Sequence, residues 1–179
     1  MNIEATFIRS AAGARDLPGD GVAEVALVGR SNVGKSSLIN ALVRQRVART
    51  SAAPGKTRLA NIFRVARGAS RPFYLVDLPG YGYARGGQAS AREFQELTRA
   101  FFSRVGQAGQ VRQVGQHTLP DPPGPPDLPA LAALLLVDSR HPGLESDVDA
   151  WAWLSTTVGA SALVATKIDK LARGERIRA

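Results

Sequence analysis

The stretch that most constrains this chain is Gly29-Arg30-Ser31-Asn32-Val33-Gly34-Lys35-Ser36. It follows the apolar residues 25–28 and precedes a segment in which leucine and isoleucine recur at helical spacing, so the order is strand, glycine-rich loop, helix. The spacing G-x-x-x-x-G-K-[ST] suits a polyphosphate, because backbone N–H groups converge on the β-phosphate while Lys35 reaches the β- and γ-phosphates. Ser36 can ligate Mg²⁺, and the helix adds its positive dipole end. The competing interpretation is a glycine-rich turn with a purely structural role.

Length and composition indicate one domain in a reducing compartment. The chain has 179 residues, of which 44% are hydrophobic, which is enough for the core of a single α/β domain spanning residues 1–179. The absence of cysteine excludes disulfides, cysteine-ligated zinc and thiol catalysis. No export signal is visible at the N-terminus, and the longest apolar run, residues 128–137, is far shorter than the roughly 20 residues that cross a bilayer. We therefore expect a cytoplasmic protein without membrane insertion.

The charge balance is strongly basic. The formal net charge is +8 and the sequence pI is near 10.8. A basic surface raises the rate of encounter with phosphate backbones, so a polyanionic partner fits this balance. The 23 Lys and Arg residues are scattered, however, and an arginine-rich proteome would produce the same totals.

Alternating strand and helix patterns predict an α/β fold. The first helix is expected to fade near Arg44, with Leu38, Ile39 and Leu42 facing a sheet. A later helix carries Phe94, Leu97, Phe101 and Phe102 on one face. The order implies a mostly parallel sheet with helices on both faces. Extended segments are expected at residues 4–9, 24–28, 61–65, 73–77, 131–138 and 161–167, and the two later helices at residues 89–104 and 145–157.

Residues 106–130 interrupt this alternation. The segment is rich in glutamine and then in proline, which predicts an exposed, partly polyproline-like insertion. Compact domains rarely contain such long connections unless they are functional or disordered. The prolines could instead offer a ligand to a partner protein.

The motif Thr166-Lys167-Ile168-Asp169 indicates which base the loop serves. It follows the last predicted strand, at the sheet edge where open α/β folds bind ligands. Asp169 can accept two hydrogen bonds from the N1–H and the N2 amino group of guanine, whereas adenine offers no such paired donors. The aliphatic stem of Lys167 can cover the base. Guanine is therefore the favoured base, and ATP remains the alternative.

Three further positions suit magnesium and the γ-phosphate. Asp77, at the end of its strand, fits the acid that orients magnesium-bound water, and Gly80 offers a backbone N–H to the γ-phosphate. Thr57 lies in the connection that begins at Arg46, where its hydroxyl could ligate Mg²⁺ only while a γ-phosphate holds the loop closed. Taken alone, Thr57 could equally be an ordinary loop threonine.

Together these residues resemble the EngB branch of bacterial GTPases. The resemblance implies a Ras-like P-loop G domain that hydrolyses GTP, binds Mg²⁺, acts as a switch in assembly of the large ribosomal subunit and is needed for normal cell division and septation. It also implies a monomer that contacts the large subunit or its rRNA and no DNA. The resemblance rests on residues 29–37, 54–57, 77–84, 138–142 and 166–171, and it extends the nucleotide contacts to Gly55, Lys56, Thr57, Arg58, Leu59, Asp77, Leu78, Pro79 and Gly80.

Two departures from the family pattern are visible. The insertion at residues 106–130 is longer than expected. The chain also stops at Ala179, soon after Asp169, where relatives continue through a Ser-Ala-type loop, a last strand and a last helix. We therefore expect a G domain that lacks these final elements, either as a fragment or as a shortened variant.

Catalysis is expected to be slow. Ras-like enzymes place a water-orienting glutamine immediately after D-x-P-G, whereas this chain has Tyr81, whose phenol cannot mimic an amide. Lys35, Thr57, Gly80 and Asn32 are the candidate catalytic residues. Asn32 is of the type that ligates K⁺ beside the phosphates in some related GTPases, although it could simply stabilise the loop. Besides a GTPase switch, the sequence leaves open a P-loop ATPase or kinase and a nucleotide-binding module without turnover.

Overall fold

The computed structural model describes residues 3–48, 59–81, 96–103 and 131–172, and within them six strands form one sheet in the order β1-β3-β4-β2-β5-β6. The two long described helices lie between strands, and residues 96–103 form a further helical segment. The strands are β1 (Ile3–Ala11), β2 (Glu24–Gly29), β3 (Ala60–Arg67), β4 (Phe73–Asp77), β5 (Leu131–Asp138) and β6 (Ala160–Thr166), and the helices are α1 (Lys35–Val43) and α3 (Glu145–Thr157).

Strand direction places the ends of four strands at one edge of the sheet. β2 runs parallel to both β4 and β5, and β5 runs parallel to β6, whereas β1, β3 and β4 pair in antiparallel fashion. The predicted mostly parallel α/β sheet is thereby confirmed. Because ligands of open α/β sheets bind beyond the carboxyl ends of parallel strands, the loops after β2, β4, β5 and β6 are the ones positioned for a site.

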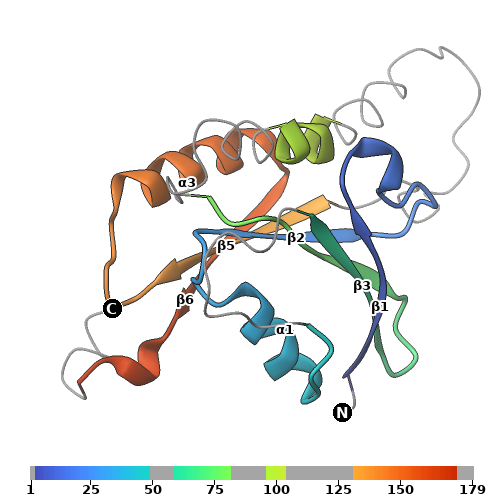
Figure 1. Cartoon of the computed structure of the whole chain (residues 1–179), viewed down its shortest axis with the longest axis horizontal. Helices are drawn as coiled ribbons and strands as arrows, with labels where there is room; N and C mark the ends of the chain where they lie inside the picture. The colour runs from blue at the N-terminus through green and yellow to red at the C-terminus, as the bar shows by residue number, and fades with distance from the viewer. Residues whose placement is uncertain (1–2, 49–58, 82–95, 104–130, 173–179) are drawn as a thin grey trace, which may run out of the picture.

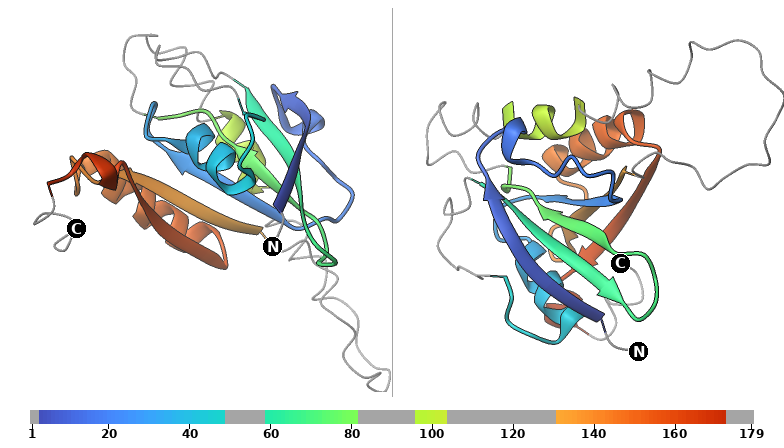
Figure 2. Two further views of the ribbon diagram at one scale, coloured as in Figure 1. Left: turned by 90° about the horizontal axis from the view of Figure 1, so that it is seen from below. Right: turned by 90° about the vertical axis from the view of Figure 1, so that its right-hand side faces the viewer.

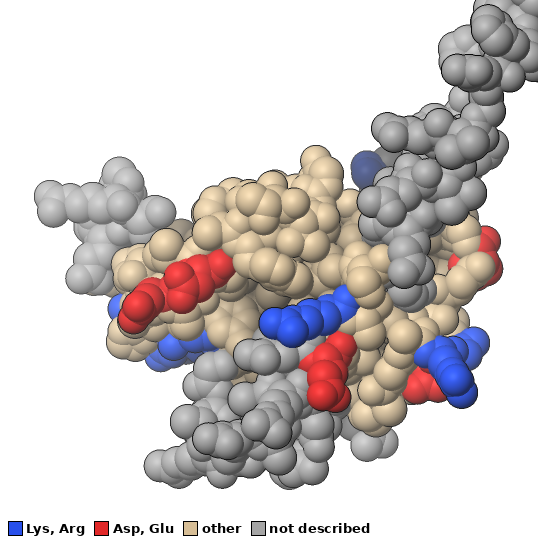
Figure 3. All heavy atoms as spheres, turned by 90° about the horizontal axis from the view of Figure 1, so that it is seen from above, with Lys and Arg blue, Asp and Glu red and all other residues tan. Residues whose placement is uncertain are grey.

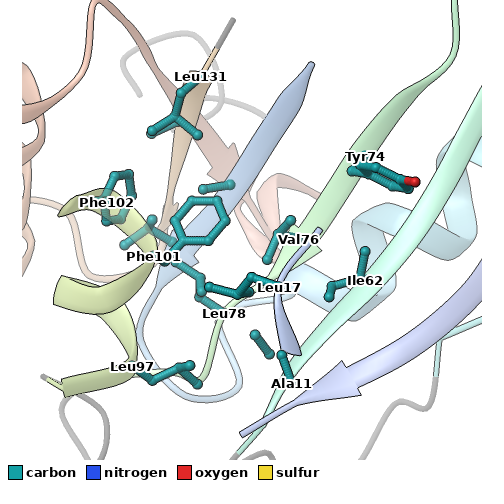
Figure 4. Packing of buried hydrophobic residues seen from close by; sticks show 14 of the residues in the cluster. Ala11, Leu17, Ile62, Tyr74, Val76, Leu78, Leu97, Phe101, Phe102 and Leu131 are labelled. Atoms are coloured by element: carbon teal, nitrogen blue, oxygen red, sulfur yellow. The ribbon is translucent and has the colours of Figure 1, made fainter. Parts of the chain in front are cut away.

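The sheet is covered on both faces, giving three layers (Figures 1 and 2). α3 and residues 96–103 lie on one face, and α1 lies on the other. On the first face, Leu97, Phe101 and Phe102 pack with Val76 of β4 and with Leu78, which follows that strand (Figure 4). On the second, Ile39 of α1 packs with Leu27, Phe63 and Leu136. Each buried large apolar side chain contributes about 1.5–3 kcal/mol to folding, so these two clusters fix the layers.

Helix α1 buries a slightly different face from the one predicted. Ile39 is fully buried and Leu38 packs against its cluster, but Leu42 is 42% exposed, and Val43 takes the inward position. The expectation for Leu42 was wrong because Ile39 and Val43, one turn apart, define the stripe that contacts the sheet. Leu42 lies to one side of that stripe. The helix ends as expected, with Arg44 in the left-handed conformation at its C-terminus.

Strand lengths differ modestly from the expected ranges. β4, β5 and α3 match them, whereas β1 and β3 are longer because their antiparallel ladder runs from Ile3 opposite Arg67 to Ala11 opposite Ala60. Phe94 and the insertion at residues 106–130 lie outside the described residues. In the described part of the chain, no helix is both long enough and apolar enough to span a membrane.

Candidate functional site

The glycine-rich loop forms the connection from β2 to α1, as the sequence predicts. Gly34 caps the helix with φ of +121°, a conformation that a side chain would strain, and Asn32 adopts the left-handed conformation. The first hydrogen bond of the helix runs from Leu38 N–H to the Gly34 carbonyl at 2.8 Å. The N–H groups of the first turn therefore remain available, and they coincide with the positive end of the helix dipole.

Lys35 lies folded across this loop. Its Nζ donates to the carbonyl oxygens of Gly29 at 3.0 Å and Arg30 at 3.3 Å, and the side chain is buried. Burial lowers the pKa of Lys35 from its ordinary value, while the neighbouring carboxylate of Asp77 opposes that shift. A buried ammonium held only by neutral carbonyls and one nearby acid is well placed to gain a phosphate oxygen as a further partner.

Ser36 and Asp77 form the arrangement expected of a magnesium site. The Ser36 hydroxyl donates to Asp77 Oδ2 at 2.8 Å, and Asp77 is only 1% exposed. Burial raises the pKa of Asp77, whereas Lys35 and the hydrogen bond from Ser36 lower it. Among the described residues, Asp77 Oδ1 has no hydrogen-bond partner. Hard oxygen donors and a buried acceptor left for a water ligand fit Mg²⁺, which binds few protein ligands and retains several waters.

The predicted base-reading motif begins where β6 ends, beside the phosphate loop. The Thr166 hydroxyl lies 2.7 Å from the carbonyl oxygen of Val33 in that loop and 2.9 Å from that of Val137 at the end of β5. Residues 133 positions apart in the sequence are thus joined directly. The structure brings together the phosphate loop and the motif that the sequence assigns to guanine.

Lys167 is held in place by Asp138, to which the sequence alone assigns no role. Its backbone adopts the left-handed conformation, and its Nζ lies 2.8 Å from Asp138 Oδ2. The Arg140 guanidinium also binds Asp138, through Nε at 3.0 Å and Nη2 at 2.8 Å. Hydrogen bonds from Arg140, followed by those from Lys167, hold the pKa of Asp138 well below its usual range. Ile168 and Asp169 remain exposed at this edge, where a base can reach them.

The segment after β4 lies directly against the phosphate loop. Leu78 and Pro79 are buried, and Leu78 N–H donates to the Leu27 carbonyl at 3.3 Å. A Cβ added to Gly80 would lie 2.5 Å from the Ser31 backbone nitrogen, so only glycine allows this approach. The Ser31 hydroxyl donates to the Gly80 carbonyl at 3.3 Å. Gly80 is therefore held beside the loop that the sequence assigns to the phosphates.

Comparison with known proteins decides the family. A family model described as "50S ribosome-binding GTPase" matches residues 24–120. The "Probable GTP-binding protein EngB" of Chlorobaculum tepidum is 39% identical over 181 residues, covering 100% of this chain and 81% of the relative. The protein of the same name from Pelotomaculum thermopropionicum is 43% identical over 173 residues, covering 96% of this chain and 74% of the relative. The chain belongs to the EngB family. It is a GTPase with a P-loop G domain.

A solved structure supports the fold of this EngB family member. Era in complex with MgGDPNP and nucleotides 1506–1542 of 16S ribosomal RNA aligns with a TM-score of 0.60, covering 88% of this chain and 44% of Era. Sequence identity is 19%, so the similarity extends to the arrangement of strands and helices and no further.

Not every residue expected at the EngB nucleotide site can be placed. Gly55, Lys56, Thr57 and Arg58 lie outside the described residues, and Leu59 is exposed just before β3. His141 closes a turn, its N–H donating to the Asp138 carbonyl at 2.9 Å.

Two acidic residues beside the site of this EngB chain, Asp138 and Asp147, were not predicted from the sequence. Asp138 could have been found, because it ends a parallel strand next to the one that carries Thr166. Asp147, in the first turn of α3, accepts a hydrogen bond from the Tyr81 phenol at 2.8 Å. No local pattern signals that contact, since the two residues are 66 positions apart.

Proposed function

We propose that this GTPase is a switch in the assembly of the large ribosomal subunit, required for normal cell division and septation. A single G domain spanning residues 1–179 carries the function. The observation that best supports a guanine-nucleotide switch is the convergence of three elements at one sheet edge: the phosphate loop, the Ser36–Asp77 pair and the Thr166–Asp169 motif. The match to the family described as a 50S ribosome-binding GTPase supports the large subunit as the partner.

The phosphates bind the loop from Gly29 to Ser36, whose backbone N–H groups and Lys35 meet the β- and γ-phosphates. Gly80 donates its N–H to the γ-phosphate. Guanine is read by Asp169 and covered by the stem of Lys167, while Thr166 joins this motif to the loop. The remaining contacts come from Gly55, Lys56, Thr57, Arg58, Leu59, Asp77, Leu78, Pro79 and Ile168.

Magnesium is held by Ser36 and Thr57. When bound, Mg²⁺ neutralises charge on the β- and γ-phosphate oxygens. Asp77 would then accept a hydrogen bond from a magnesium-bound water through Oδ1, which is buried and has no partner among the described residues. The hydroxyl hydrogen that Ser36 now donates to Asp77 leaves the serine oxygen lone pairs available for the metal.

Turnover is slow and depends on K⁺. The Tyr81 phenol is directed toward Asp147, so it does not take the role of a water-orienting glutamine. Asn32, in the left-handed conformation within the phosphate loop, is the K⁺ ligand. A cation there supplies positive charge where other GTPases use an arginine finger.

The partner is the large ribosomal subunit or its rRNA, and the protein acts in the cytoplasm as a monomer. The net charge of +8 supports a polyanionic partner. On the face shown in Figure 3, positive and negative side chains of the described residues are interspersed and form no single basic patch. We therefore expect ribosome binding to depend on the bound nucleotide as well as on overall charge.

Two measurements test this proposal. Titration with GTP, GDP and ATP, with and without Mg²⁺, should show magnesium-dependent binding of guanine nucleotides only. Co-sedimentation with purified large subunits should be stronger with a non-hydrolysable GTP analogue than with GDP and should weaken steeply as salt rises. Equal sedimentation in both nucleotide states would reject the switch, and binding of ATP as tight as that of GTP would reject the base assignment.

A further inference from the structure

Three side chains from three separate elements meet beside the phosphate loop: Arg30, Tyr81 and Asp147. We propose that Tyr81 and Asp147 are positioning residues that hold Gly80 in place for the γ-phosphate and thereby set the preference for GTP over GDP. The inference rests on the proposed contact between the Gly80 N–H and the γ-phosphate. It assigns a task to Tyr81 that is separate from activation of water.

The side-chain contacts converge on one carboxylate oxygen. The Tyr81 phenol donates to Asp147 Oδ1 at 2.8 Å, and Arg30 Nε lies 3.3 Å from the same oxygen. Asp147 comes from the first turn of α3 and is only 4% exposed. Arg30 belongs to the phosphate loop, and Tyr81 follows Gly80 directly. The carboxylate therefore ties both segments to a helix that lies on the sheet.

Backbone contacts lie on the other side of Gly80. The Ser31 N–H donates to the Tyr81 carbonyl at 3.0 Å, and Arg30 and Tyr81 form an isolated parallel β-bridge. The Ser31 hydroxyl reaches the Gly80 carbonyl, and no Cβ would fit between Gly80 and Ser31. With its carbonyl bound on one side and the next residue anchored at both backbone and side chain, Gly80 has little freedom to move from the loop.

This arrangement is costly if it serves the fold alone. Among the described residues, Asp147 Oδ2 is buried without a hydrogen-bond partner. Arg30 Nε is also buried, and although it lies 3.3 Å from Asp147 Oδ1 it makes no hydrogen bond. A buried charged pair is often no more stabilising than apolar side chains of the same volume. Burial, and then the hydrogen bond to Asp147, raise the pKa of Tyr81, so the phenol remains a donor at any physiological pH. Such locally unfavourable polar groups are typical of positions with a functional task.

The consequence is a difference between the two nucleotides. GDP lacks the γ-phosphate, so its affinity does not depend on where the Gly80 N–H lies. GTP gains the full contact only if that N–H is already in place, because otherwise part of the binding free energy is used to order the segment. Loosening the anchor should therefore weaken GTP binding and leave GDP binding as it is.

The test is a double-mutant cycle on the full chain in the presence of Mg²⁺, with GDPNP and GDP as ligands. Tyr81→Phe removes only the hydroxyl and should weaken GDPNP binding by about fivefold, the lower end of typical coupling between sites. Its GDP affinity should match that of the parent. Asp147→Ala should lower the GDPNP-to-GDP preference similarly, and combining the two changes should give no further loss, because they break the same contact.

Two matched controls separate positioning from general stability. Tyr74→Phe removes another phenol–carboxylate hydrogen bond, to Asp20 at 2.7 Å, and Asp149→Asn removes an exposed acid on α3. Both should keep the parental preference. An unchanged preference in Tyr81→Phe, or an equal loss for both nucleotides together with a lower Tm, would overturn the inference while leaving the proposed switch intact. Equal GDPNP and GDP affinities in the parent would overturn both proposals.

Discussion

Replacing Asp138 by asparagine should weaken GTP and GDP binding by the same factor. Asp138 receives three side-chain hydrogen bonds, from Lys167 Nζ at 2.8 Å and from Arg140 Nε and Nη2 at 3.0 and 2.8 Å. Only the first of these orients a residue that we assign to the base. The base contact is common to both nucleotides, so the preference between them should not change.

The size of the expected loss in binding follows from how exposed Asp138 and Lys167 are. One hydrogen bond to a charged group contributes about 1.5–3 kcal/mol. The Asp138 side chain is 6% exposed, but that of Lys167 is 27% exposed, so water replaces part of the lost contact. We therefore expect a loss of about 1 kcal/mol in binding, or about fivefold in Kd for each nucleotide.

Equilibrium titration of Asp138→Asn and Arg140→Ala with GDP and GDPNP measures this effect. Arg140→Ala removes the other partner of the same carboxylate and keeps the Lys167 contact, so it should change Kd less. The reasoning is refuted if Asp138→Asn lowers Tm but leaves both Kd values at the parental level, because Asp138 would then serve the fold alone.

The stability that Asp138 contributes to the fold should be lost as pH falls. Arg140 and Lys167 depress the pKa of Asp138 in the folded chain, so its contribution is fully present above the unfolded-state pKa of about 3.9 and is lost as pH falls below it. The difference in stability between parent and Asp138→Asn should be constant from about pH 5 to about pH 8 and shrink below about pH 4. Chemical denaturation at a series of pH values measures it.

Three further changes have defined outcomes. Asp169→Asn should weaken GTP binding and improve binding of xanthosine nucleotide, whose exchanged donor and acceptor suit an amide. Titration with GTP and xanthosine triphosphate measures this, and unchanged selectivity would contradict the assignment of Asp169 to the base. Lys35→Ala should cost about 3 kcal/mol of nucleotide binding, more than about a hundredfold, with the fold retained in a thermal melt. Phe101→Ala, at a fully buried position, should cost about 3–5 kcal/mol of stability and lower Tm by about 10 °C. A Tm equal to that of the parent within error would contradict the packing shown in Figure 4.

The sequence predicted the parts of this molecule that depend on local patterns. The phosphate loop, β4, β5 and α3 each combine a clear periodicity or motif with turn-forming residues. The rule on carboxyl ends of parallel strands placed residues 166–169 at the ligand-binding edge of the sheet, where Thr166 contacts the phosphate loop. Leu42 was misplaced because several apolar residues of α1 share helical spacing, and only the sheet decides which of them turn inward.

Contacts between distant side chains could not be predicted in the same way. The Asp138–Lys167 pair requires knowing that β5 and β6 are neighbours, and the Tyr81–Asp147 pair requires knowing how α3 lies on the sheet. Neither arrangement has a local signature, since each depends on packing between separate elements. Both pairs nevertheless contact or adjoin residues that we assign to the nucleotide site, Lys167 and Gly80.

The bond between Thr166 and Val33 also has a consequence during synthesis. Its two ends are 133 residues apart, and at about 5–20 residues per second the ribosome needs about 7–27 s to add that length. If Asp169 reads the base as proposed, a nascent chain in that interval carries a phosphate loop but lacks the residue that distinguishes guanine from adenine. On that assignment, selective GTP binding begins only when β6 joins the sheet, and nucleotide bound from then on stabilises the finished fold by mass action.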